Sequence, residues 1–319
     1  MTRSWKFFLT NSRSVASLLL IFFLVGGESH LLWGQGLTSY ILFNRKEGAG
    51  KWRSEAVFLD EEGVAVIVTD AGVDFRSGKY NGEPVSLLAY DPVSRVGLIK
   101  VPLDAGQQTK PVELGSSLTL KPANQLYPSL EGETFSSRIV SRESEYKSEP
   151  LPFELFRVHH QADQKLFPGH PLYDSAGRLV AINYRGAGEF GNGSFAFPVE
   201  VVKRIQNATV IDSLVQRSWF GVELLASDPF ASVQGVRQAS PAAKAGIVKG
   251  DILLQIGPRP ICCYADAINA FYYLREGEEA VVKFMRGTDL LESIVLPELV
   301  PSNPLVQPVT DSSKAEGGA

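Results

Sequence analysis

Short runs of β-branched and aliphatic residues, separated by turn-forming residues, constrain the fold of this chain more than any other feature. Between residues 54 and 183 these runs lie at 56–59, 65–69, 85–89, 96–101, 153–158 and 179–183. Gly, Pro, Asp and Asn bound them, as is typical of strands joined by turns. Strands in βαβ units would instead alternate with longer helical patterns. The sequence therefore predicts an all-β barrel or sandwich in this part of the chain.

The pattern changes after residue 198, where helices are expected. Val201, Val202, Ile205 and Ile211 recur at helical spacing, which predicts a helix over residues 199–211. A second unit is expected from about residue 218. Its predicted strands are 220–225, 233–237, 251–256, 280–285 and 291–296, and its predicted helices are 240–246 and 265–274.

The N-terminal residues 1–36 are typical of a secretory signal peptide. Arg3, Lys6 and Arg13 precede the apolar run 15–25, which is only about half as long as a helix that spans a bilayer. We therefore expect an exported protein, periplasmic or extracellular. The alternative is an uncleaved signal anchor that tethers the same domains to the membrane. At the other end, the proline-containing residues 300–319 are expected to be disordered.

Charge and cysteine content exclude several function classes. The formal net charge is -4 and the basic residues are scattered, so we expect no nucleic-acid partner. Cys262 and Cys263 are adjacent, which excludes a disulfide framework. We expect them to be small buried apolar residues, with a vicinal redox switch as the alternative. His159, His160 and His170 have no partners at ligand spacing, so neither a metal site nor a cofactor is expected.

Residues 240–253 (SPAAKAGIVKGDIL) resemble the "SPAAKAGLKPGDVIL" run of bacterial PDZ domains, and residues 217–222 (RSWFGV) stand where their carboxylate-binding loop begins. The resemblance implies a peptide-binding unit over residues 213–299. Gly221 allows a turn in which successive N–H groups surround a terminal carboxylate. The residues expected to bind a peptide are Trp219, Phe220, Gly221 and Val222, with Ile268 and Phe271 lining the pocket. The alternative for Ile268 and Phe271 is that they only fill the core.

The first unit resembles the protease half of HtrA-type serine proteases. The stretches that carry the resemblance are DEEGVAVIVT (60–69), YDPVSRVGLIKV (90–101), LGSS followed by LKP (114–122), PL with a downstream GRLV (171–180) and SFAFP (194–198). The resemblance implies a mainly β chain: a chymotrypsin-like double β-barrel over residues 37–212, followed by the PDZ domain, itself an α+β, partly open barrel.

When the chain is aligned with these motifs, the three positions of the catalytic triad are occupied by residues that lack the required chemistry. Gly72 stands where the general base is expected, Arg95 replaces the orienting carboxylate, and Pro168 replaces the nucleophile. Proline also lacks the backbone N–H that contributes to the oxyanion hole in these enzymes. We therefore predict that the chain has no conventional triad and is not an active enzyme.

A catalytic site formed away from the usual triad positions would need a serine, a histidine and oxyanion donors within hydrogen-bond reach of one another. The candidate bases are His159, His160 and His170, and nearby serines are Ser136, Ser137 and Ser175. These serines lie outside the loop that presents the nucleophile in this fold. His159 and His160 are neighbours on a predicted strand, so we expect one to be buried and the other exposed.

The function predicted from the sequence is that of an exported pseudoprotease. It would bind peptides or protein C-termini through the PDZ groove, as a scaffold, adaptor or holdase. The alternatives are an active endopeptidase with a displaced site and a decoy subunit that regulates an active HtrA paralogue. The resemblance also implies trimers formed through the N-terminal part of the barrel, for which Tyr40, Leu42 and Phe43 are candidates.

Overall fold

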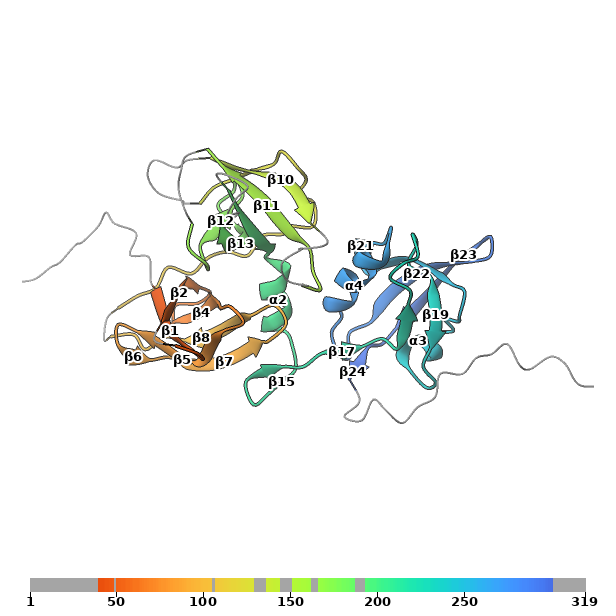
Figure 1. Ribbon diagram of the computed structural model, residues 1–319, viewed down its shortest axis with the longest axis horizontal. Helices are drawn as coiled ribbons and strands as arrows, with labels where there is room; N and C mark the ends of the chain where they lie inside the picture. Colours follow the sequence, from red (N-terminus) through yellow and green to blue (C-terminus); the bar gives the residue numbers. More distant parts are fainter. Residues whose placement is uncertain are drawn as a thin grey trace, which may run out of the picture. The chain divides into compact units, whose positions relative to one another are not determined.

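The computed structural model describes residues 40–48, 50–104, 107–128, 136–143, 151–161, 166–186 and 193–300, all of which fall in the compact unit that begins at Thr38. The predicted signal peptide and nearly all of the predicted C-terminal tail lie outside these ranges. Within them, no helix has the length and apolar character needed to cross a membrane. The prediction of a mainly β chain is confirmed (Figure 1).

Two sheets form the first barrel. The smaller has the strand order β2-β1-β5-β6, and its strands are β1 Tyr40–Arg45, β2 Lys51–Glu55, β5 Val73–Tyr80 and β6 Glu83–Pro84. The larger has the order β15-β16-β7-β8-β4-β3, and its strands are β3 Val57–Phe58, β4 Val64–Val68, β7 Ser86–Asp91, β8 Val96–Lys100, β15 Val210–Ile211 and β16 Leu214–Val215. Ile41, Phe43, Ile67 and Ile99 are fully buried between them. Side chains alternate along β1, so that Ile41 and Phe43 point into the barrel and Leu42 points outward.

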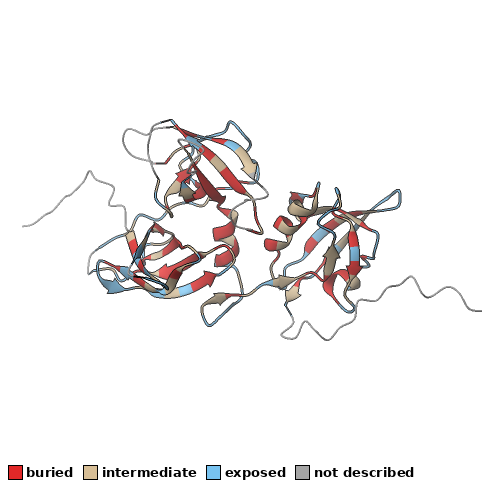
Figure 2. Cartoon of the chain, in the orientation of Figure 1, coloured by how far each residue is buried: buried red, intermediate tan, exposed pale blue. Residues whose placement is uncertain are grey.

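The second barrel is built on one sheet in the order β12-β13-β14-β11-β10-β9. Its strands are β9 Gln125–Leu126, β10 Ser137–Glu143, β11 Leu155–His160, β12 Pro171–Tyr173, β13 Leu179–Gly186 and β14 Gly193–Pro198. Strands β13 and β14 are almost continuously buried, which Figure 2 shows as red ribbon. This burial on both faces explains why their sequences read as continuous apolar runs.

Helix α2, Glu200–Gln206, packs against strands β7 and β8 of the first barrel and β14 of the second. Its buried Val201, Val202 and Ile205 share one apolar cluster with residues from both barrels. The prediction that this helix extends to residue 211 is wrong. Asn207 ends it, since its side-chain amide donates to the carbonyl oxygen of Lys203 (2.8 Å), and Ile211 lies exposed in β15.

The C-terminal unit contains three small sheets and two helices. The sheets are β17-β24, β18-β19 and β21-β20-β22-β23, with bounds β17 Ser218–Trp219, β18 Val222–Leu224, β19 Val233–Val236, β20 Ile252–Ile256, β21 Arg259–Pro260, β22 Ala280–Arg286, β23 Asp289–Val295 and β24 Glu298–Leu299. The helices are α3 Pro241–Lys244 and α4 Tyr264–Tyr272. Ser240 caps α3, because its hydroxyl accepts a hydrogen bond from the Ala243 N–H (3.1 Å).

The two cysteines are free thiols at the start of α4. Cys263 is its half-buried N-cap residue, whereas Cys262 is exposed. The expectation that both are buried apolar residues is therefore wrong for Cys262. The reason is local: the Cys262 N–H donates to Asp266 Oδ2 (3.0 Å), which holds the residue on the surface ahead of the helix.

Candidate functional site

The three triad-equivalent positions belong to segments that hydrogen bonds tie together. The Glu55 N–H donates to the carbonyl oxygen of Pro168 (2.8 Å), and the Val68 N–H donates to the hydroxyl of the neighbouring Ser54 (2.9 Å). The Thr69 N–H in turn donates to the carbonyl oxygen of Arg95 (2.9 Å). The turn after β4, the Arg95 turn and the Pro168 loop are therefore neighbours.

The Pro168 loop is packed so closely against β2 that only glycine fits at its next position. Gly169 has a φ of +88°, and a Cβ atom there would lie 2.2 Å from the carbonyl oxygen of Glu55. The Gly169 N–H donates to the carbonyl oxygen of Asn183 (2.9 Å). This N–H and that of Glu55 are both used within the protein, so neither points at a vacant oxyanion position.

Arg95 has a left-handed backbone conformation, with a φ of +61°. Its Nη1 donates to the phenol oxygen of Tyr184 (2.9 Å), and Nη2 of Arg185 donates to the same oxygen (3.3 Å). Where a triad carboxylate would accept a hydrogen bond from histidine, the chain therefore places guanidinium groups, which only donate.

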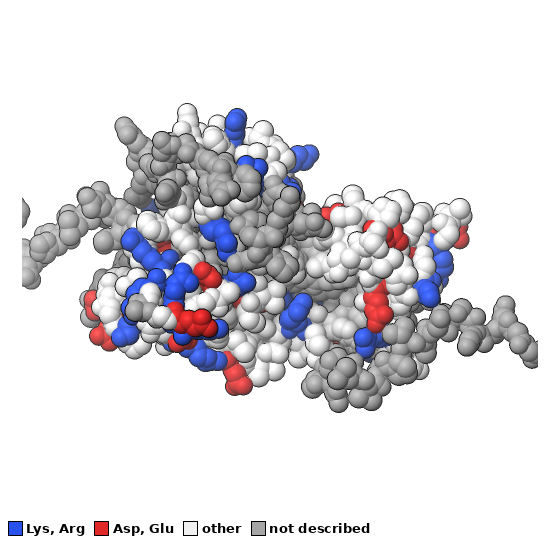
Figure 3. All heavy atoms as spheres, in the orientation of Figure 1, with Lys and Arg blue, Asp and Glu red and all other residues white. Residues whose placement is uncertain are grey.

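Gly72 lies in the turn between β4 and β5 and has no side chain to act as a base. Its N–H donates to Asp70 Oδ1 (3.2 Å), and its carbonyl oxygen accepts from the Lys46 N–H (2.8 Å). Asp70 also lies 3.5 Å from Arg45, so the only carboxylate of this turn is paired with a cation. Figure 3 shows the same mixing of basic and acidic side chains over the described surface of the first barrel.

The ring of His170 is not hydrogen-bonded to a residue that could act as a nucleophile. Its Nδ1 lies 2.7 Å from Glu55 Oε2, and its Nε2 lies 2.9 Å from the carbonyl oxygen of Pro128. Both ring nitrogens therefore have partners, and neither partner is a hydroxyl group. The histidine nearest to Pro168 in sequence fixes the loop to β2 instead of activating a serine.

A serine and a histidine do meet, but inside the second barrel. His160 hydrogen-bonds through Nδ1 to the Ser137 hydroxyl (2.8 Å) and through Nε2 to the Ser194 hydroxyl (2.9 Å). All three residues are 1% exposed, and burial lowers the pKa of His160 to about 4. The neighbouring His159 is exposed, which confirms the expected alternation. This cluster is neutral and closed to a peptide substrate.

The other two candidate serines are not bonded to histidine in the described residues. Ser136 donates to the side chain of Gln161 (2.7 Å), and Ser175 is exposed in the turn before β13. Metal ligands are not clustered either, since within the described ranges no three His, Cys, Asp or Glu residues come together.

In the C-terminal unit, the loop between β17 and β18 has the geometry of an anion-binding turn. Gly221 has a φ of +87°, and a Cβ atom there would lie 2.2 Å from Ser240 Cβ. The carbonyl oxygens of Phe220 and Gly221 accept hydrogen bonds from Ala242 (3.0 Å) and Arg237 (2.8 Å). In a trans peptide the N–H points opposite to the C=O, so the N–H groups of Gly221 and Val222 point away from α3 and β19.

The structure differs from the predicted set of donors at one residue. Trp219 belongs to β17, where it pairs with Glu298, and is not one of the turn amides. Val222 pairs with Val236 in β18 and β19, which form a sheet of two strands among the described residues. The outer edge of β18 is therefore available for a third strand, next to the Gly221 turn.

Helix α4 lies next to the Gly221 turn. Ile268 and Phe271 are half-buried, and the Phe271 ring lies 5.0 Å from that of Phe220, against the apolar core. Tyr264, Ile268 and Phe271 follow each other at i, i+4 and i+7 and so share one helix face. The sequence analysis missed Tyr264, although its helical spacing from Ile268 was a usable signal.

Comparisons with known proteins agree with this geometry. A family model described as a PDZ domain matches residues 218–295. A curated protein from Pseudomonas putida, named "Probable periplasmic serine endoprotease DegP-like", is 29% identical over 63% of this chain and 45% of its own length. A protein of the same name from Hahella chejuensis is 26% identical over 66% of this chain and 48% of its own length. The chain thus spans about half the length of the curated relatives it matches.

Solved structures have the same fold. A chain of the HtrA-type protease AlgW with a tripeptide superposes with a TM-score of 0.54 at 19% identity, covering 83% of this chain and 94% of AlgW. A second AlgW structure, with a decapeptide, gives a TM-score of 0.51 at 19% identity and covers 85% of this chain and 96% of that one. The chain therefore has the fold of these HtrA-type proteases, and its residues 218–295 match a PDZ domain.

The PDZ domain is joined to the barrels through a buried polar cluster on α4. The Tyr272 hydroxyl donates to Asp91 Oδ2 (2.7 Å), and Arg204 Nε donates to the carbonyl oxygen of Tyr272 (2.5 Å). Arg204 Nη1 lies 3.4 Å from Asp91 Oδ2. Burial raises the pKa of Tyr272 well above its usual value, so the phenol remains a donor. Sequence reasoning missed this cluster, because the residues are far apart in the chain.

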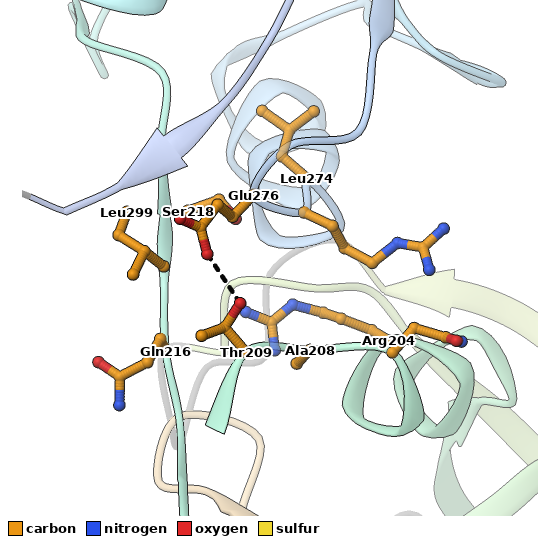
Figure 4. Close-up of a pocket in the computed structure, with 10 residues that line it drawn as sticks. Arg204, Ala208, Thr209, Gln216, Ser218, Leu274, Glu276 and Leu299 are labelled. Atoms are coloured by element: carbon orange, nitrogen blue, oxygen red, sulfur yellow. Dashed lines mark hydrogen bonds between the residues drawn. The ribbon is translucent and has the colours of Figure 1, made fainter. Parts of the chain in front are cut away.

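Beside this cluster, a small pocket separates the PDZ domain from the segment after α2 (Figure 4). The Thr209 hydroxyl donates to Glu276 Oε2 across it (2.8 Å), and Leu274 and Leu299 supply apolar walls. None of its lining residues belongs to β18 or α4. We therefore assign it to the packing of the PDZ domain and not to peptide binding.

Of the residues expected to form trimers, Phe43 is unsuitable. It is fully buried in the first barrel, so it is not available to a second chain. Tyr40 stacks against the guanidinium of Arg53, which also contacts Phe167. Leu42 points outward, with 47% of its surface exposed. The prediction for Phe43 is wrong because it placed the adjacent residues Leu42 and Phe43 on one surface, whereas strand alternation exposes Leu42 and buries Phe43.

Proposed function

We propose that this chain is an exported pseudoprotease that binds peptides or protein C-termini through its PDZ groove, as a scaffold, adaptor or holdase. The observation that carries the proposal is the Gly221 turn. Its positive φ and its contact with Ser240 leave the N–H groups of Gly221 and Val222 pointing away from the fold. Two convergent N–H groups beside an open strand edge suit a peptide that ends in a carboxylate.

The groove also has the walls that such a peptide needs. The unpaired edge of β18 offers backbone hydrogen bonds, and Ile268 and Phe271 offer apolar surface to the last side chain of the peptide. Ile268 is half-buried and lies on the same helix face as Phe271, whereas the core side of α4 is formed by Ala267 and Ala270. This division favours a role for Ile268 beyond filling the core.

The proposed loss of catalysis is supported by the residues at the three triad positions. Gly72 has no side chain, Arg95 donates to Tyr184, and Pro168 has neither a hydroxyl nor an N–H. Loss of one oxyanion donor alone lowers kcat by about two to three orders of magnitude. The site therefore lacks a base, a nucleophile and one electrostatic contribution at once.

Measuring peptide binding to the full-length protein tests the proposed groove. We expect a peptide with a free C-terminal carboxylate to bind more tightly than the same peptide with an amidated C-terminus, by fluorescence anisotropy. Gly221→Val should abolish binding of the free-acid peptide, and Ile268→Ala should weaken it about tenfold. The control is Ile211→Ala, which is exposed in β15 of the first barrel. Equal binding of acid and amide would contradict a carboxylate-binding turn.

The competing function is that of an active endopeptidase, because the curated relatives are named serine endoproteases. Fluorescent casein and an active-site phosphonate probe distinguish the two. We expect no cleavage and no labelling of any serine. Labelling of Ser137 or Ser194 would show that the second barrel opens to expose them, and labelling of any serine would overturn the pseudoprotease proposal.

Two further properties belong to the same proposal. Relatives named periplasmic proteases support export to the periplasm, and the family resemblance favours assembly as a trimer or with an active HtrA paralogue. Co-expression with such a paralogue, followed by affinity purification and mass analysis, tests the decoy-subunit alternative. Recovery of homo-oligomers alone would count against it.

A further inference from the structure

The β22–β23 hairpin of the PDZ domain leaves one strand edge unpaired. Strand β23 ends the four-stranded sheet β21-β20-β22-β23, and no strand of the described residues pairs with its outer side (Figure 1). This edge belongs to a different sheet from the β18 edge of the peptide groove. It is therefore a separate surface from the proposed binding site.

The hairpin register identifies which backbone groups face outward. The two-residue turn Gly287–Thr288 pairs Arg286 with Asp289, and pairing continues without a bulge to Ala280 and Val295. The carbonyl oxygen of Val281 accepts from Gly257 on the β20 side (2.8 Å), so its partner Ile294 is in a pair that is not hydrogen-bonded to β22. By alternation, the N–H and C=O groups of Leu290, Glu292 and Ile294 point away from β22.

The side chains of the same three residues are exposed. Leu290 is 70% exposed, Ile294 is 58% exposed, and the Glu292 side chain between them is 59% exposed. Natural proteins protect such edges with charged side chains, proline or a bulge, because an open edge pairs with other chains. Strand β23 has neither proline nor a bulge between Asp289 and Val295, and Glu292 is the one charged residue among Leu290, Glu292 and Ile294.

The charge of Glu292 restricts what can pair with this edge. If two β23 strands paired in antiparallel orientation, they would pair through the outward backbone groups of Leu290, Glu292 and Ile294. Glu292 would then lie opposite a second Glu292 or opposite an apolar side chain. Like charges directly opposite are destabilising. A basic residue flanked by apolar residues at alternate positions suits the edge better. On β22, Val281, Lys283 and Met285 already face Ile294, Glu292 and Leu290 in this way, and Lys283 lies 3.7 Å from Glu292.

We propose that the edge of β23 is a second docking site, which takes an extended protein segment with an apolar–basic–apolar alternation. The segment adds as a fifth strand and receives backbone hydrogen bonds from Leu290, Glu292 and Ile294. Its basic side chain lies beside Glu292, and its apolar side chains cover Leu290 and Ile294. The binding does not require a free carboxylate, unlike binding in the β18 groove.

A blocked peptide tests this site in the full chain. The peptide TVTKTVT, acetylated and amidated, is compared with TVTETVT by fluorescence anisotropy. We expect the lysine peptide to bind more tightly to the unmodified chain. Glu292→Pro removes the outward N–H but no β22 ladder bond, since proline is tolerated on an edge strand. It should weaken binding of the lysine peptide about tenfold.

Glu292→Lys is the matched variant, because it keeps the N–H and reverses the charge. It should transfer the preference to TVTETVT, and Ile268→Ala should leave both affinities unchanged. Thermal unfolding checks that each variant is folded. Unchanged affinities in both Glu292 variants would overturn the proposal. So would loss of binding in Ile268→Ala, which would place the peptide in the β18 groove, or self-association of the chain that Glu292→Pro abolishes.

Discussion

The phenol of Tyr272 donates to Asp91 Oδ2 at 2.7 Å, across 181 residues of sequence. Tyr272 is adjacent to Phe271 in the PDZ helix, and Asp91 ends strand β7 of the first barrel, where its carbonyl oxygen accepts from the Arg95 N–H (2.7 Å). One hydrogen bond therefore links the helix of the proposed peptide groove to the turn that carries a triad-equivalent residue. Asp91 is 1% exposed, so it depends on its partners within the protein.

Removing this hydroxyl tests how much the cluster contributes to stability. Tyr272→Phe keeps the ring against Phe153 but leaves a buried carboxylate oxygen with one donor fewer. We expect the free energy of unfolding to fall by about 1.5–3 kcal/mol, the usual cost for a hydrogen bond to a buried charged group. Urea unfolding measures it. Tyr264→Phe, in the first turn of the same helix, where Tyr264 is half-buried, is the control and should change stability little.

Stability should depend on pH through His160. Its pKa is about 4 in the folded protein and 6.5 in a solvated chain, so between these values the unfolded state binds more protons. The contribution to stability is complete above pH 6.5 and is lost as the pH falls to 4, by about 3 kcal/mol in total. Urea unfolding at pH 7, 5.5 and 4 measures the loss.

A variant separates His160 from the other groups that titrate in this range. His160→Gln has no titratable group and should show a smaller loss of stability between pH 7 and pH 4 than the unmodified chain. The exposed His159→Gln is the control. If His160→Gln and the unmodified chain had the same pH dependence, another group would be responsible.

Gly169 and Gly82 form a matched pair for testing the Pro168 loop. Both have positive φ, +88° and +92°, but a Cβ atom meets Glu55 at 2.2 Å in the first case and nothing within 4 Å in the second. Gly82→Ala should cost only the left-handed backbone penalty, about 1 kcal/mol. Gly169→Ala should cost at least about twice as much, measured by thermal unfolding. Equal effects would mean that the Pro168 loop moves freely away from β2.

Ser240 connects helix capping to the carboxylate turn, since its hydroxyl caps α3 and its Cβ faces Gly221. Ser240→Ala should destabilise the PDZ domain by about 1 kcal/mol through loss of the cap. Because Ala keeps the Cβ contact, the affinity for a free-acid peptide should change less than in Gly221→Val. Ser227→Ala, in an exposed turn, is the control. A complete loss of peptide binding in Ser240→Ala would show that the hydroxyl itself contacts the ligand.

Much of the local structure could be predicted from the sequence. Short apolar runs bounded by turn residues predicted six strands of the two barrels, and Ser240 with Pro241 predicted the capped helix α3, because these signals act between near neighbours. Helix α2 was predicted too long, since Ile211 fits a helical period but pairs in β15 with Leu214. Phe43 was misplaced for the same kind of reason: hydrophobicity alone does not tell which face of a strand is buried.

The sequence by itself determined the order of strands and helices, the glycine turn at Gly221 and the side chains available at positions 72, 95 and 168. Only the tertiary structure decided which distant groups meet. It placed Tyr272 on Asp91, enclosed His160 between Ser137 and Ser194, and left β23 at the edge of its sheet. The physical reason is that pairing and burial depend on non-local packing, whereas turns, caps and periodicity depend on residues a few positions apart.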